Sequence, residues 1–137
     1  MTESDKGYRE IEHTADWELE AWGPTLPDLF EQSARGMYQL SGAIIDRSAR
    51  CEQQICLSAQ DWESLLVSFL SELLFIGETK GTAFDGFEIN LDAGMLKGRL
   101  SGGKLKALEK EIKAVTYHEL QIEHDCPGFR VRIVFDV

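Results

Sequence analysis

The segment from Trp62 to Leu74 constrains the fold more than any other part of the sequence. Its apolar side chains recur at the spacing of successive helical turns, which predicts a helix with one broad apolar face. These residues are Trp62, Leu65, Leu66, Phe69, Leu70, Leu73 and Leu74. Ser58 or Asp61 is placed to cap the helix, and the stretch 77–81, with glycine at both ends, is expected to end it. A face of this kind is far more often core than ligand site, so we expect this helix in the core.

A second helix is predicted from Leu26 to Met37. Gly23-Pro24 breaks the preceding segment, and Thr25 stands three residues before Asp28, which is typical of a helix start. Apolar residues then follow at helical spacing until Gly42, a residue type that commonly ends helices. They are Leu26, Leu29, Phe30, Ala34 and Met37.

Alternating apolar and polar residues predict strands around these helices. The expected strands cover residues 8–12, 16–22, 51–57, 84–91 and 95–100. A turn at 92–94 is expected to join the last two. Strands interspersed with two helices indicate an α+β fold with a mixed or antiparallel sheet. We expect one domain over residues 8–137, preceded by a disordered lead-in over residues 1–7.

The end of the chain is predicted to form a β-hairpin around a turn at 125–128. Pairing His124 with Phe129 leaves a four-residue loop, which is a common hairpin length. Opposite charges across strands are worth about 0.2–1 kcal/mol, and this register pairs Glu123 with Arg130. The further expected pairs are Gln121 with Arg132, Leu120 with Ile133, Ile122 with Val131, and Tyr117 with Asp136.

Charge and composition narrow the function classes. The formal net charge of −10 disfavours stable, direct nucleic-acid binding and favours cations and basic protein partners. No run of about 18 apolar residues predicts a membrane span, and the first residues do not resemble a secretory signal. Three cysteines, an odd number, are then expected to be reduced thiols of a cytoplasmic protein. The basic residues within 97–113 are more simply explained as a solvated hairpin or loop than as a contact surface.

The last two residues include the strongest candidates for metal ligands. Asp136 directly precedes Val137, and a free carboxylate on Val137 would lie one residue from the Asp136 side chain. Two carboxylates this close repel each other unless a cation or a proton lies between them. Asp16 is a third candidate, and an oxygen-only set suits Ca²⁺, Mg²⁺ or Mn²⁺ better than Zn²⁺. From the residues alone, solvated surface aspartates are the commoner case, since nothing in the spacing brings Asp16 to Asp136.

Three basic or titratable side chains are further candidates. His13 and His118 are able to ligate a metal or carry a proton, although His118 shares a face with Leu120 and is more often a partly buried structural histidine. Lys113 is able to offer its charge to a phosphate or carboxylate, but an isolated lysine is more often simply solvated. The stretch 98–104 matches the first seven positions of a phosphate-binding P-loop, but Leu105 replaces the required Ser or Thr, so we reject that motif.

Several segments, taken together and in order, resemble the archease family. They are Ile11-Glu-His-Thr-Ala-Asp16, Leu29-Phe-Glu-Gln-Ser-Ala-Arg-Gly-Met37, Leu65-Leu-Val-Ser-Phe-Leu-Ser-Glu-Leu-Leu-Phe75, Glu111-Ile-Lys-Ala-Val-Thr-Tyr-His118 and Val134-Phe-Asp-Val137. Each segment is weak alone. The first and fourth segments combined with an aspartate near the chain end are specific. One departure is the stretch 102–108, which lacks a Glu and a His expected from relatives.

The resemblance implies an α+β fold with a metal site near the chain termini. It implies that Asp16, Asp136 and the terminal carboxylate of Val137 are the ligands, with Ca²⁺ as the first expectation and Mg²⁺ or Mn²⁺ as alternatives. Lys113 matches a position that the family treats as functional, and His13 and His118 lie within the motifs.

The resemblance also implies a non-enzymatic role beside an RtcB-type RNA-splicing ligase. That manganese- and GTP-dependent enzyme joins RNA ends bearing 2′,3′-cyclic phosphate or 3′-phosphate to 5′-hydroxyl ends. The family promotes guanylylation of the ligase and sustains multiple turnover. The alternative is a chaperone or adaptor for RNA-modifying enzymes with a structural metal. A metal-dependent phosphate-ester hydrolase is disfavoured, because few acid–base candidates besides His13 and His118 are present.

Overall fold

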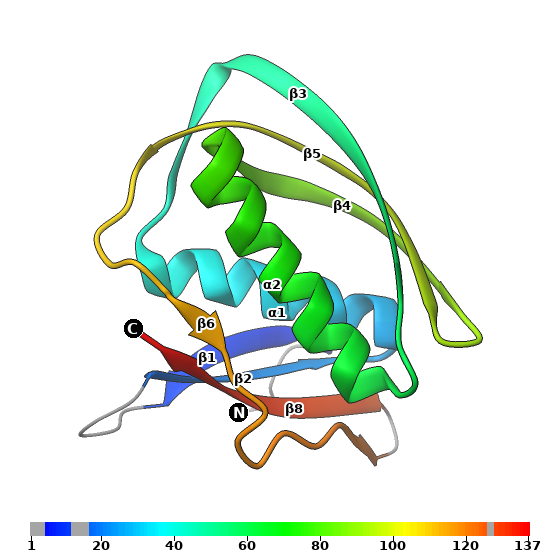
Figure 1. Ribbon diagram of the computed structural model, residues 1–137. Coiled ribbons are helices and arrows are strands. Elements are labelled where there is room, and N and C mark those ends of the chain that lie inside the picture. The colour runs from blue at the N-terminus through cyan, green and yellow to red at the C-terminus, as the bar shows by residue number, and fades with distance from the viewer. Residues whose placement is uncertain (1–4, 12–16, 126–127) are drawn as a thin grey trace.

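The computed structural model describes residues 5–11, 17–125 and 128–137 (Figure 1). The elements, in chain order, are β1 (Gly7–Ile11), β2 (Trp17–Gly23), α1 (Leu26–Ser41), β3 (Ile44–Ser58), α2 (Trp62–Lys80), β4 (Thr82–Asp92), β5 (Met95–Ala107), β6 (Ala114–Val115), β7 (Glu123–Asp125) and β8 (Gly128–Asp136). The predicted lead-in falls largely outside these residues, although Gly7 already belongs to β1.

Both predicted helices are confirmed, and side-chain caps begin them. The Thr25 hydroxyl accepts the backbone N–H of Asp28 at the start of α1. Asp61, not Ser58, caps α2 by accepting the N–H of Ser64 at 2.7 Å. Each helix ends at a glycine with positive φ, Gly42 at 67° and Gly81 at 62°, a conformation that favours glycine. Among the described residues no helix has the length and apolarity needed to cross a membrane.

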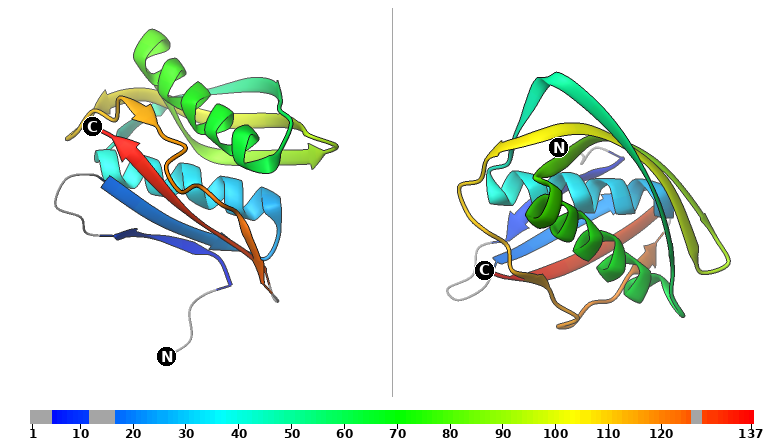
Figure 2. Two further views of the ribbon diagram at one scale, coloured as in Figure 1. Left: turned by 60° about the horizontal axis from the view of Figure 1, so that its bottom comes forward. Right: turned by 45° about the horizontal axis from the view of Figure 1, so that its top comes forward.

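Within the described chain, the strands form two antiparallel sheets. A five-stranded sheet has the order β1-β2-β8-β6 with β7 also paired to β8, and a three-stranded sheet has the order β3-β5-β4. Helix α1 packs on the five-stranded sheet. Helix α2 crosses α1 on the side that faces the three-stranded sheet (Figures 1 and 2). The predicted α+β class is therefore confirmed.

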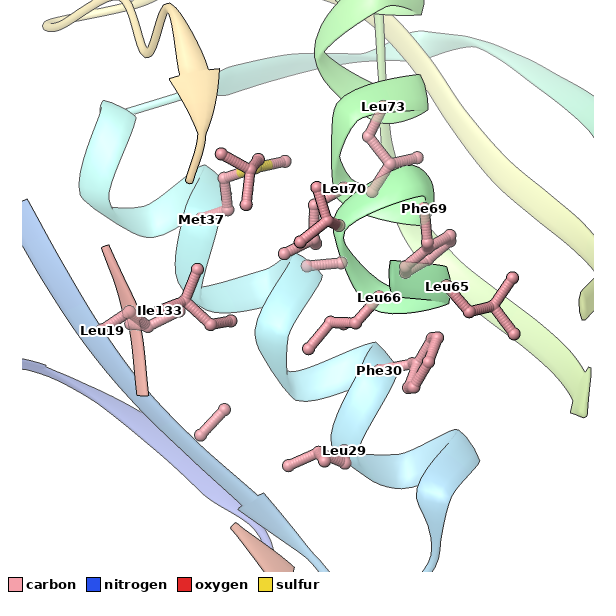
Figure 3. Packing of buried hydrophobic residues seen from close by; sticks show 14 of the residues in the cluster. Leu19, Leu29, Phe30, Met37, Leu65, Leu66, Phe69, Leu70, Leu73 and Ile133 are labelled. Atoms are coloured by element: carbon pink, nitrogen blue, oxygen red, sulfur yellow. The ribbon is translucent and has the colours of Figure 1, made fainter. Parts of the chain in front are cut away.

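The core lies where the two helices meet between the sheets. The apolar face of α2 supplies Leu65, Leu66, Phe69, Leu70 and Leu73, all at most 1% exposed. Phe69 packs against Phe30 of α1 with ring centroids 5.9 Å apart, and Leu19 and Ile133 close the core from the five-stranded sheet (Figure 3). The face predicted to be buried is thus the centre of the molecule.

Strands β3 and β5 are longer than predicted. Strand β5 continues past Leu100 to Ala107, so the first part of the basic stretch 97–113 is the central strand of the three-stranded sheet. Its basic residues Lys97, Arg99, Lys104 and Lys106 are exposed on the β4–β5 hairpin, as expected of a solvated hairpin. The rejected P-loop segment lies inside this strand. A Cβ on Gly102 would collide with the carbonyl oxygen of Ala83, so this glycine permits close strand packing and not phosphate binding.

The predicted register of the terminal hairpin is confirmed near its turn and is wrong beyond it. His124 pairs with Phe129 and Glu123 with Arg130, as predicted. Asp136, however, lies opposite Ala114 instead of Tyr117. The segment 117–122 leaves the ladder, because the N–H of Ile122 donates to the Glu63 carboxylate of α2 at 3.0 Å and Leu120 turns back to bond the Tyr117 carbonyl. The expected pairs of Leu120, Gln121 and Ile122 with β8 therefore do not form.

Candidate functional site at the end of the last strand

Strand β8 ends in an exposed aspartate whose backbone is fixed from both sides. The preceding residue, Phe135, is fully buried and is paired with Trp17 of β2 and Val115 of β6. The carbonyl oxygen of Asp136 accepts the N–H of Lys113 at 2.7 Å. The Asp136 side chain is exposed, and in the described part of the chain it makes no ion pair. The strand thus presents one carboxylate to solvent from a rigid base.

Two predicted site residues, His13 and Asp16, lie outside the described residues. The described residue next to Asp16 is Trp17, which is the cross-strand partner of Phe135, the residue before Asp136. The Lys110 ammonium lies 5.4 Å from the centroid of the Trp17 ring, a cation–π contact that ties the 108–113 segment to β2. The chain neighbours of the two aspartates are therefore paired directly.

The backbone of Lys113 is hydrogen-bonded to Asp136, whereas His118 lies beyond the short pairing of β6 with β8. Ile112 and Val115, both buried, hold the backbone on either side of Lys113, whose side chain is exposed. His118 is exposed as well, so the expectation of a partly buried histidine is wrong. It lies in the 117–122 segment that leaves the ladder, two residues after Thr116. Thr116 donates both its N–H and its hydroxyl to the Val134 carbonyl, at 3.0 and 2.9 Å.

Among the described residues, the side-chain oxygen donor at this strand end is the carboxylate of Asp136. Val137 packs its side chain against the core, which anchors the residue after Asp136. Carboxylate oxygens are the ligands that Ca²⁺, Mg²⁺ and Mn²⁺ prefer. Residues 5–11, 17–125 and 128–137 contain no cluster of three or more His, Cys, Asp or Glu side chains placed to hold a metal. The predicted set draws Asp16 from outside these ranges and a main-chain carboxylate from Val137.

The other acids on this part of β2 are already neutralised by arginines. Glu20 is buried and accepts a hydrogen bond from Arg9 at 2.7 Å, with Arg130 at 3.3 Å and Arg132 at 3.6 Å. Burial raises the pKa of Glu20, but the Arg9 hydrogen bond and the three guanidinium charges outweigh it, so the pKa is lowered overall. Glu18 pairs with Arg132 at 3.7 Å. These carboxylates hold the sheet together, whereas that of Asp136 remains open to solvent.

Replacing Glu20 with glutamine should destabilise the fold by about 1–3 kcal/mol at pH 7, because charge-assisted hydrogen bonds are lost in a buried place. A carboxyl with a lowered folded-state pKa stabilises above its unfolded value of 4.5 and loses that effect as pH falls through the folded pKa. The stability difference between the two proteins should therefore shrink towards pH 3. Urea unfolding at both pH values measures it.

The matched control is Glu88→Gln, since Glu88 lies 4.0 Å from Arg99 and its side chain is 73% exposed. This control should change stability little, because exposed ion pairs contribute little. An equal loss for Glu20→Gln at pH 7 and pH 3 would rule out the electrostatic explanation.

Sequence reasoning missed a pocket beside Lys113. Its volume is about 400 Å³, within the range of ligand pockets, and it lies between the C-terminal ends of α1 and α2 and the segment 105–113. Buried Met37 and Leu73 line it together with exposed Leu108 and Lys113. The one local signal of this pocket in the sequence was Leu108, an apolar residue in a polar stretch. Its exposed fraction is 46%.

The chain is similar in sequence and in fold to known proteins. The model of the "Archease protein family (MTH1598/TM1083)" matches residues 8–137. The protein archease of Methanosarcina mazei is 37% identical, with 100% of both chains covered. The archease of Pyrococcus furiosus is 32% identical, covering 85% of this chain and 87% of its own. A crystal structure from Thermotoga maritima, described as an archease and "possible chaperone", has a TM-score of 0.70 and 26% identity, and covers 94% of this chain and 96% of that one.

Proposed function

The chain belongs to the archease family, and on that basis we propose that it is a non-enzymatic activator of an RtcB-type RNA-splicing ligase. The ligase performs the chemistry, and the chain promotes its guanylylation and multiple turnover. The observation that carries the proposal is the exposed Asp136 carboxylate at the end of β8, held by a fixed backbone and without an ion pair among the described residues.

The register of β2 and β8 in the five-stranded sheet supports a shared metal site. Strands β2 and β8 pair without interruption from Gly23 opposite Phe129 to Trp17 opposite Phe135. One more step of the same register would pair positions 16 and 136. Directly paired antiparallel residues have Cα atoms about 4.5–5.5 Å apart, a separation that suits two carboxylates sharing one cation with metal–oxygen bonds of about 2.3–2.6 Å.

The proposed ligands are Asp16, Asp136 and the terminal carboxylate of Val137, if Val137 is the last residue of the protein. Ca²⁺ is the proposed cation, with Mg²⁺ or Mn²⁺ as alternatives. When bound, it would offer positive charge to phosphate groups in the ligase cleft. The chain's own residues position the ligands: Phe135 anchors the strand in the core, and the N–H of Lys113 fixes the carbonyl of Asp136.

A ligase assay tests this function. Purified ligase receives GTP and an RNA pair with a 2′,3′-cyclic phosphate and a 5′-hydroxyl end, with and without the chain at substoichiometric amounts. We expect faster guanylylation of the ligase and more ligated product per ligase molecule. Guanylylation and turnover that are the same with and without the chain would contradict the proposal.

The second candidate is a chaperone or adaptor for RNA-modifying enzymes, in which the metal is structural. It is kept because the related Thermotoga maritima protein is described as a "possible chaperone". Suppression of aggregation of an RNA-modifying enzyme, without any effect on ligase guanylylation, would favour this candidate over the first.

A further inference from the structure

We propose that the basic end of the three-stranded sheet contacts the phosphate backbone of the RNA that the ligase joins. This inference rests on the proposed function, because it adds a contact with the substrate of that ligase. The basic end is defined by three neighbouring segments: residues 44–50 of β3, residues 80–86 at the end of α2 and the start of β4, and residues 101–107 of β5. Its charged residues are Arg47, Arg50, Lys80, Lys104 and Lys106, with Asp46 and Asp85.

The charge of the chain is unevenly divided between this end and the rest of the molecule. The three segments carry five basic and two acidic side chains, which is a formal charge of +3. Because the whole chain carries −10, the other residues carry −13. A polyanion is therefore attracted to the basic end and repelled by most of the remaining surface.

Folding brings together cations that are far apart in the sequence. Leu105 donates its N–H to the Gly81 carbonyl at 2.7 Å, and this bond holds Lys80, at the end of α2, beside β5 (Figure 1). On the other side of β5, the segment 46–49, which carries Arg47, lies so close to a glycine of β5 that a Cβ there would collide with it. The sequence alone showed the lysines of β5, whereas the structure adds a lysine and an arginine beside them.

The two lysines at the end of β5 point away from the pocket between the helices. Leu105, which separates them in the strand, lines that pocket. Successive side chains of a strand point to opposite faces, so Lys104 and Lys106 face outward, and both are exposed. The acidic residues Glu78 and Glu111 line the pocket and therefore lie on the other side of the strand.

The two acids of the basic end are held by specific partners. The Asp46 carboxylate accepts the N–H and the hydroxyl of Ser48 at 2.9 and 2.7 Å. These hydrogen bonds, and to a smaller extent the charges of the two lysines at the end of β5, lower the pKa of Asp46. Asp85 accepts two hydrogen bonds from Arg50, at 3.0 and 2.6 Å, so the charges of this pair cancel. Four cations therefore stand against the one remaining acid.

The kind of cation favours RNA over an acidic protein as the ligand. Three of the five cations are lysines, which are depleted in the cores of protein–protein interfaces but commonly contact phosphate oxygens. The net charge of −10 still opposes free RNA, so the chain alone should bind RNA weakly. The contact becomes effective when the ligase holds the RNA nearby, because the local concentration of RNA is then high.

Lys104→Gln with Lys106→Gln tests the contact. A labelled single-stranded RNA that ends in a 2′,3′-cyclic phosphate is titrated with purified ligase in the presence of saturating chain, and fluorescence anisotropy gives the RNA affinity. We expect the double variant to weaken RNA binding at least about fivefold at about 50 mM salt. Each phosphate contact to a single strand contributes about 0.7 to the slope of log affinity against log salt, so the slope should fall by about 1.4. Guanylylation of the ligase, measured without RNA, should still be stimulated.

The control Lys97→Gln with Arg99→Gln removes the same charge from the same strand, outside the basic end. Glu88 lies 4.0 Å from Arg99 there, and Lys97 is about 23 Å along the strand from Lys104. This control should change RNA affinity less than about twofold, because salt screens charges that far away. Lys104→Arg with Lys106→Arg keeps the charge and should keep the RNA affinity. All these side chains are exposed, so every variant should unfold at the same urea concentration as the original.

Acetylation of amines followed by mass spectrometry reports the contact at individual lysines. Lys104 and Lys106 should be protected when ligase and RNA are both present, whereas Lys97 should react as it does in the free chain. Protection by ligase without RNA would mean that an acidic surface of the ligase covers the basic end, and it would overturn the RNA contact.

Unchanged RNA affinity in Lys104→Gln with Lys106→Gln, while guanylylation is still stimulated, would overturn the RNA contact and leave the proposed function standing. An original chain that does not stimulate guanylylation would overturn the proposed function, and the RNA contact with it.

Discussion

Asp136→Ala should reduce ligase turnover to the level of ligase alone. The carboxylate of Asp136 is the proposed side-chain ligand that the structure describes, and the substitution removes it. The fold should remain, because Lys113 bonds the backbone carbonyl of Asp136 and not its side chain. Exposed side chains without such contacts usually change stability by no more than about 0.5 kcal/mol. Ligase turnover and urea unfolding of the same protein preparation measure both effects.

The control for this substitution is Asp92→Ala. Asp92 is also an exposed aspartate at the end of a strand, but it lies at the turn between β4 and β5 in the other sheet. Its replacement makes the same change in net charge and should leave stimulation intact. Full stimulation by Asp136→Ala would remove this carboxylate from the proposed mechanism.

Phe69→Ala should cause one of the largest losses of stability among alanine substitutions in α2. Phe69 is fully buried and packs against Phe30 of α1, so truncation leaves a cavity at the meeting point of both helices (Figure 3). Phenylalanine-to-alanine changes in cores cost about 3–5 kcal/mol. Urea unfolding followed by circular dichroism should therefore show a much lower midpoint.

The same helix offers a matched control in Phe75, which is 57% exposed. Phe75→Ala removes the same atoms without opening an internal cavity and should cost far less than Phe69→Ala. Equal losses for the two variants would mean that helix propensity, and not core packing, decides the stability of α2.

Much of the fold could be predicted because its signals are local. The cap residues Thr25 and Asp61 and the terminal glycine Gly42 act within one helical turn, so they can be recognised in a short window of sequence. The turn end of the last hairpin was likewise predicted, since pairing of His124 with Phe129 depends on loop length alone.

The register beyond that turn could not be predicted, because a distant residue decides it. Glu63 accepts the N–H of Ile122 although 59 positions separate them in the chain, and this bond holds the 117–122 segment away from β8. The alternation of apolar and polar residues in that segment therefore predicted a strand that the structure does not have there. The predicted partner of Asp136 was wrong for the same reason.

Only part of the candidate site could be reached from sequence. Asp136 was recognisable as an oxygen donor from the sequence alone, whereas the position of its strand beside β2 depends on the sheet order. The pocket draws its walls from α1, α2 and the segment 105–113. No single stretch of sequence carries a signal for a cavity that three separate segments enclose.

Calorimetric titration with Ca²⁺ tests the shared carboxylate site most directly, using the original chain, Asp16→Ala, Asp136→Ala and the double variant. If the two carboxylates hold one ion, each single substitution should weaken Ca²⁺ binding strongly, and the double variant should be little worse than either one, since residues acting as a unit are not additive. Unchanged Ca²⁺ affinity in either single variant would contradict a site that joins the two ends of the chain.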